Sequence, residues 1–80
     1  MKSYILTKEV ADTIAETLCA ERLKLRLNHA EMAQKLTIGP KILAKLERRE
    51  VKRIHSEDIE ALRVYFGKRL AIEKVWASPA

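Results

Sequence analysis

The stretch at residues 27–47, LNHAEMAQKLTIGPKILAKLE, holds two short amphipathic segments separated by Gly39 and Pro40. In each segment the apolar residues are spaced so that they share one face of a helix: Met32 and Leu36 in the first, Leu43 and Leu46 in the second. Pro40 suits the first position of a helix, where its missing N–H group is not needed, and Gly39 then becomes the N-cap. The stretch therefore predicts two helices joined by a tight turn, whose close crossing the small Ala33 allows.

The second predicted helix has a basic face opposite its apolar one. Lys41, Lys45 and Arg48 are spaced i, i+4 and i+7, with Ala44 between them, so they form one stripe. A helix with an anchored inner face and a basic outer stripe fits the major groove of DNA. The alternative is an ordinary solvated cationic face.

The same stretch resembles the lambda-repressor-like (Cro/repressor, XRE-type) helix-turn-helix family of bacterial and phage DNA-binding domains. The resemblance covers roughly residues 18–67, and the matching positions are Leu27, Asn28, His29, Met32, Ala33, Leu36, Thr37, Ile38, Gly39 and Glu47. It implies an all-α domain of five helices, with the helix-turn-helix proper at about residues 28–48.

Three residues depart from the family pattern. Thr37 replaces a turn glycine, Pro40 replaces a polar residue, and Arg49 stands where a glycine often closes the second helix. Because a β-branched residue disfavours positive φ, we expect the turn at Thr37 to be either reshaped or strained.

The resemblance also implies roles for individual residues. The residues expected to read bases are Pro40, Lys41, Ile42, Ala44 and Lys45. The residues expected to bind phosphate are Asn28, His29, Arg48, Arg49, Lys52 and Arg53. Arg22 is expected to pair with Glu47; the alternative is that Arg22 extends to solvent over its apolar stem. The alternative for His29 is that it is an ordinary exposed polar residue. The alternative for the cations after the second helix is that they only increase solubility.

Composition and charge agree with a small helical DNA-binding domain. The 80 residues are 48% hydrophobic, with two Gly and two Pro, which favours one all-helical domain. The net charge is +5, and residues 41–53 contain six basic and two acidic residues. Most of the positive excess is thus concentrated on and after the second helix, which is compatible with a nucleic-acid partner.

Several classes of site have no support in the sequence. Cys19 is the only cysteine, and it has no metal-ligand spacing with His29 or His55, so we expect neither a disulfide nor a metal or other cofactor. No phosphate-binding glycine loop or nucleophile–base pattern suggests an enzyme. No apolar run has the length of a membrane span and no signal-peptide pattern is seen, so we expect a cytoplasmic protein without a membrane partner.

The rest of the chain predicts three further helices. A lead-in at residues 1–6 precedes a first helix that Thr7 caps and that ends near Leu25. A basic loop follows the predicted helix that begins at Pro40. Ser56 caps a fourth helix, which ends before Gly67. A fifth helix spans about residues 68–76 and is followed by a tail at 77–80. The predicted core contains Leu18, Leu25, Met32, Leu36, Ile38, Leu43, Leu46, Ile59, Leu62 and Phe66.

Some apolar residues are not needed by this core, and they predict a homodimer interface: Val10, Ile14, Ile72, Val75 and Trp76. The alternative is that the two terminal segments pack on each other within one chain. The function expected is a sequence-specific double-stranded DNA-binding regulator, a repressor acting as a homodimer on two half-sites and located with the nucleoid. The alternative is an antitoxin or other interaction module that binds a toxin or another regulatory protein.

Overall fold

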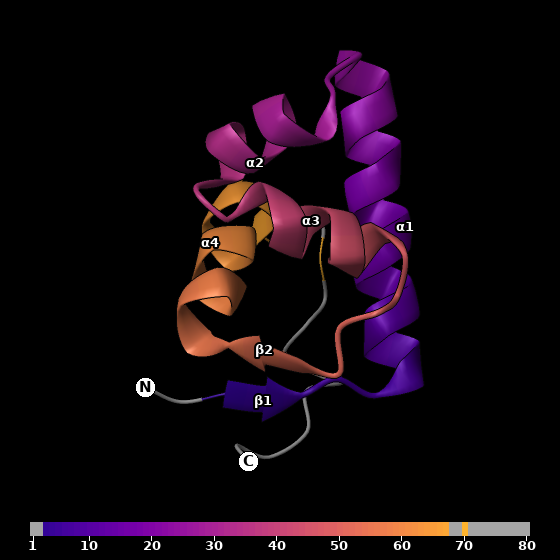
Figure 1. The fold of residues 1–80 in the computed structure, drawn as a ribbon, viewed down its shortest axis with the longest axis vertical. Coiled ribbons are helices and arrows are strands. Elements are labelled where there is room, and N and C mark those ends of the chain that lie inside the picture. Colours follow the sequence, from indigo (N-terminus) through magenta and orange to yellow (C-terminus); the bar gives the residue numbers. More distant parts are fainter. Residues whose placement is uncertain (1–2, 68–69, 71–80) are drawn as a thin grey trace.

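The computed structural model describes residues 3–67 and Leu70, and it is mostly helical with a small two-stranded sheet (Figure 1). The elements in chain order are β1 Ser3–Ile5, α1 Lys8–Leu25, α2 His29–Leu36, α3 Pro40–Glu47, β2 Arg53–His55 and α4 Ser56–Phe66. Along the longest axis α2 lies at one end, α3 in the middle and the strands at the other end, with α1 running alongside (Figure 1). The sequence-distant N-terminal strand and the segment after α3 thus meet at one end of the molecule.

The predicted starts of the first three helices are confirmed, because each is set by a local cap. The side chain of Thr7 accepts a hydrogen bond from the N–H of Val10 at 3.3 Å. Asn28 and Glu31 form a reciprocal capping box at the start of α2. Gly39 precedes α3, whose first residue is a proline. The start of α4 differs from prediction: Ser56 is its first residue, and His55 precedes it without a side-chain cap.

The expectation that the basic segment at residues 48–56 forms only a loop is wrong, because β2 pairs antiparallel with β1. Tyr4 lies opposite Ile54, and Ile54 is buried. The N–H of Leu6 donates to the carbonyl of Lys52 at 2.9 Å and extends the pairing by one residue. The polar–apolar–polar order Arg53-Ile54-His55 is the period of a half-buried strand, and burial of Ile54 holds the register.

Four helices are present in residues 3–67, whereas the sequence predicted five. The predicted fifth helix at 68–76 and the tail at 77–80 lie outside the described residues, except for Leu70, which is buried in the core. Gly67, which follows α4, has φ 56°, a conformation that glycine adopts without strain.

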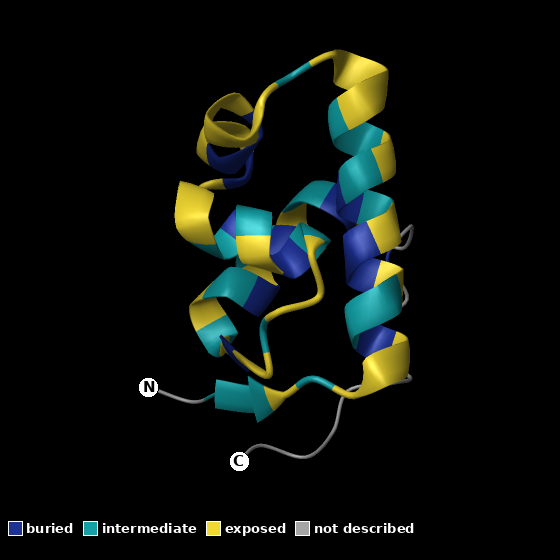
Figure 2. Cartoon of the chain, turned by 45° about the vertical axis from the view of Figure 1, so that its right-hand side comes forward, coloured by how far each residue is buried: buried dark blue, intermediate teal, exposed yellow. Residues whose placement is uncertain are grey.

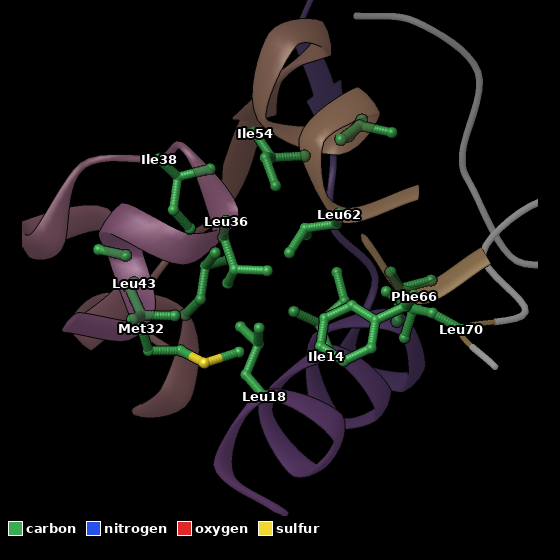
Figure 3. Packing of buried hydrophobic residues seen from close by; sticks show 14 residues of the cluster. Ile14, Leu18, Met32, Leu36, Ile38, Leu43, Ile54, Leu62, Phe66 and Leu70 are labelled. Carbon is green, nitrogen blue, oxygen red and sulfur yellow. The ribbon is translucent and has the colours of Figure 1, made fainter. Parts of the chain in front are cut away.

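One apolar cluster joins α1, α2, α3, β2 and α4, and Figure 3 shows side chains from these elements converging on it. The predicted core residues belong to this cluster with one exception. Leu25, the last residue of α1, is 38% exposed, so its assignment to the core was wrong. Arg26 takes a left-handed conformation directly after it, and Leu27 packs against the cluster instead.

Val10 and Ile14 are not an exposed surplus face, which corrects their assignment to a dimer interface. They are 1% and 0% exposed and belong to the same cluster as Phe66 and Leu70. Phe66 at the end of α4 and Leu70 therefore help to cover this face of α1 within one chain. Ile72, Val75 and Trp76, the other predicted interface residues, lie outside the described part of the chain.

The turn between α2 and α3 keeps a glycine-like shape despite its threonine. Thr37 has φ 62° and ψ 37°, the left-handed region, and its N–H donates to the carbonyls of Ala33 and Gln34. The N–H of Ile38 also donates to the carbonyl of Ala33, at 3.0 Å, which completes a Schellman-type helix end. Ile38 is buried beside this turn, so packing holds Thr37 in its unfavourable conformation.

Relieving this strain is expected to stabilise the protein. Thr37→Asn should raise the free energy of unfolding by about 1 kcal/mol, because asparagine tolerates the left-handed region that a β-branched residue disfavours. Thermal unfolding followed by circular dichroism measures the change. Thr17→Asn, the same substitution within α1, is the matched control and should give no stabilisation. Equal effects at both positions would contradict the strain.

Candidate nucleic-acid interface

The helix α3 divides into a buried face and an exposed basic face. Leu43 and Leu46 are 0% and 2% exposed and anchor the helix in the core. Lys41, Lys45 and Arg48 are all exposed, as their spacing predicted. Figure 2 shows the same alternation of buried and exposed residues along the helix. The packing of the leucines thus fixes the direction in which the three cations point.

The other residues predicted to read bases are placed unequally. Pro40 is exposed at the start of α3 next to Lys41, while Ala44 is half-buried. Ile42 is also half-buried and packs against the apolar cluster, so its expected reach into a DNA groove is not supported. Three of the five candidates, Pro40, Lys41 and Lys45, therefore form the exposed set.

The predicted pair of Arg22 and Glu47 is present and links α1 to the last residue of α3. Arg22 Nε donates to Glu47 Oε2 at 2.9 Å and Oε1 at 3.2 Å, and Nη2 donates to Oε1 at 3.1 Å. The exposed fractions of the two side chains are 17% and 7%. The hydrogen bond to Glu47 raises the pKa of Arg22 above its ordinary value, although burial acts in the opposite direction.

The same arginine also holds the start of α2. Arg22 Nη1 donates to the carbonyl of Leu27 at 3.3 Å, and His29 Nε2 lies 3.5 Å from Glu47 Oε1. One partly buried ion pair therefore positions the end of α3 and the residues before α2 relative to each other. His29, with a side chain 46% exposed, contacts this pair and still reaches solvent.

The N-terminus of α2 keeps free hydrogen-bond donors. The capping box of Asn28 and Glu31 occupies the side chain of Asn28 and the N–H groups of both residues. Among the residues that the structure describes, the N–H groups of His29 and Ala30 have no acceptor. A phosphate at this helix end would meet these two donors, with Asn28 acting as the cap.

The two arginines after α3 have different surroundings. Arg48 Nη2 lies 3.3 Å from Glu50, and both side chains are more than half exposed, so solvent screens this pair. Arg49 instead turns toward α1, where its Nε lies 2.7 Å from Asp12 Oδ1 and its Nη2 lies 3.8 Å from Glu16. Arg49 has a left-handed backbone with φ 60°. Because its side chain is paired with these carboxylates, its expected phosphate role is not supported.

The strand β2 and the residue before it carry exposed polar groups. Because Ile54 points into the core, Arg53 and His55 point outward on the same strand, and Lys52 is exposed just before it. His55 was not predicted as a functional residue. The alternation Arg53-Ile54-His55 is the signal that identifies its outward direction.

The described residues contain no group of three or more His, Cys, Asp or Glu side chains arranged to hold a metal ion. None of the helices in that part of the chain combines the length and apolar character needed to cross a membrane. Comparisons with known protein families, with curated proteins and with solved structures found no match to this chain.

Proposed function

We propose that this protein is a sequence-specific double-stranded DNA-binding transcriptional regulator with a lambda-repressor-like helix-turn-helix, acting in the cytoplasm as a homodimeric repressor. The observation that carries the proposal is α3, which is anchored by Leu43 and Leu46 and exposes Lys41, Lys45 and Arg48. A helix of this kind, preceded by a tight turn and a second short helix, fits a major groove.

In this proposal the start of α3 reads bases. Lys41 and Lys45 donate to guanine O6 and N7, while Pro40 and the half-buried Ala44 offer apolar contact to a thymine methyl group. The first turn of α3 has no Arg, Asn or Gln for bidentate contacts. Sequence-dependent shape of the DNA therefore supplies part of the specificity.

The surrounding residues bind the phosphate backbone. Arg48, Lys52 and Arg53 are exposed cations after α3. The free N–H groups at the start of α2 are further donors for a phosphate, beside the end of α3, where His29 lies 3.5 Å from Glu47. Two such domains on half-sites about 34 Å apart would provide the specificity that one recognition helix lacks.

Two classes of alanine variant are expected to separate these roles. Lys41→Ala and Lys45→Ala should each cost about 1–3 kcal/mol on the preferred site and change the sequence preference. Lys52→Ala should weaken binding on all sequences and lower the salt slope by about 1. Fluorescence anisotropy over a salt series, after selection of sites from random duplex DNA, measures both effects.

The matched control is Arg63→Ala, which removes the same charge from α4, behind α3 in the view of Figure 1. It should leave affinity and salt slope nearly unchanged. If all the variants behave alike, the division between base-reading and phosphate-binding residues is wrong. If the wild-type protein shows no steep salt dependence, the alternative of a protein-interaction module such as an antitoxin takes precedence.

A further inference from the structure

A groove lies between the end of α2 and α4, and none of the exposed cations of α3 lines it. Its lining includes Lys35 and Leu36 on the α2 side and Glu57, Glu60, Ala61 and Val64 on the α4 side. Val64 is 78% exposed, more than any other large hydrophobic residue in the described part of the chain. An apolar strip formed by Ala61 and Val64 is therefore open to solvent between two polar edges.

The two edges of this groove carry opposite charges. Lys35 supplies the positive edge, and Glu57 and Glu60 supply the negative one. Within the residues the structure describes, neither Lys35 nor Glu57 has an oppositely charged group within 4 Å, and Glu60 has only an exposed contact with Arg63 at 3.8 Å. The charges that face each other across the groove thus do not pair within one chain.

We infer that this groove is a self-complementary surface through which two copies of the chain associate about a two-fold axis. In such an interface every contact occurs twice. If one residue of the first copy contacts a different residue of the second copy, the same two residues also meet with the copies exchanged. Lys35 of each copy then meets Glu57 and Glu60 of the other, and the two Val64 side chains meet near the axis. The inference specifies the surface of the homodimer in the proposed function, in place of the buried Val10 and Ile14.

Charge favours a second copy of this chain as the occupant. The chain carries a net charge of +5, so two copies repel over most of their surfaces. The groove differs from most of the surface, because the carboxylates of Glu57 and Glu60 lie on one side of its apolar strip and Lys35 lies on the other. A two-fold rotation converts this arrangement into two attractive clusters on either side of an apolar centre.

Reversing the charges of one edge at a time tests the pairing. Lys35→Glu alone, or Glu57→Lys with Glu60→Lys, places like charges together in both clusters of a homodimer. Each variant should raise the dissociation constant at least about tenfold, measured by sedimentation equilibrium without DNA. An equimolar mixture of the two variants restores opposite charges in both clusters, so it should form a heterodimer with nearly the wild-type dissociation constant.

A second variant tests the apolar centre. Val64→Gln removes apolar surface from both copies and should weaken association about tenfold or more, while its exposed position leaves the monomer folded. Leu23→Gln is the matched control, because Leu23 is 61% exposed on α1 and does not line the groove. Circular dichroism of each variant confirms that a change in association is not a loss of folding.

Three results would overturn the inference: a wild-type protein that stays monomeric, reversed variants that associate as well as the wild type, or a mixture that does not recover. Because association is measured without DNA, these results are independent of the salt-dependent DNA-binding test. A protein that fails here but binds DNA with a steep salt dependence keeps its proposed DNA-binding function; reversed variants that still associate reject only this interface, whereas a monomeric wild type also rejects a homodimer formed without DNA.

Discussion

Removing either partner of the Arg22–Glu47 pair is expected to lower the free energy of unfolding by about 3–5 kcal/mol, because the remaining charge is left partly buried without a counterion. Glu47 is 7% exposed and accepts three hydrogen bonds from one guanidinium group. Among the residues that the structure describes, Arg22→Met leaves this carboxylate with only the half-exposed His29 at 3.5 Å. The substitution also removes the hydrogen bond from Arg22 to the carbonyl of Leu27. The residues before α2 are therefore released together with the end of α3.

A double-mutant cycle of Arg22→Met and Glu47→Gln, read by urea unfolding, measures the coupling between the two side chains. The double variant should cost less than the sum of the single variants, because no unpaired ion remains. Arg48 and Glu50 form the matched control cycle, since that pair is exposed and should show a coupling below about 1 kcal/mol. Zero coupling between Arg22 and Glu47 would show that the pair contributes nothing to stability.

The second large effect is expected at Ile14, which is 0% exposed at the centre of α1. Ile14→Ala should cost about 2–5 kcal/mol, the range for truncating a fully buried isoleucine. In a domain of this size each kcal/mol lowers the melting temperature by about 4–8 °C. Because the residues that cover Ile14 belong to the same chain, the loss should not depend on protein concentration.

Thermal unfolding over a wide range of protein concentration checks this result, with Leu23→Ala as the exposed control on the same helix. That control should change stability by less than about 0.5 kcal/mol. If Ile14→Ala left the monomer intact and only reduced association, Ile14 would belong to an interface between chains and the core described above would be incomplete.

Local features of the sequence were sufficient to predict where most helices begin and end. Thr7 caps α1, Asn28 and Glu31 cap α2, and Gly39 with Pro40 starts α3. Each of these features acts over three or four residues, so it is visible without knowledge of the fold. The spacing of Leu43 and Leu46 against Lys41 and Lys45 likewise sufficed to predict which face of α3 is buried. The Arg22–Glu47 pair was expected from the resemblance to a known family, together with the position of Arg22 on an otherwise apolar stripe of the first helix.

Contacts between residues far apart in the sequence decided the rest. β2 exists because Ile54 reaches the core while its backbone pairs with Tyr4, about fifty residues away. Arg49 pairs with Asp12 and Glu16 of α1, more than thirty residues away in the sequence. The sequence alone determined the helices and the polarity of their faces, because capping and periodicity are local. Only the tertiary structure determined which of those faces the chain covers itself and which remain exposed, because that depends on where distant segments pack.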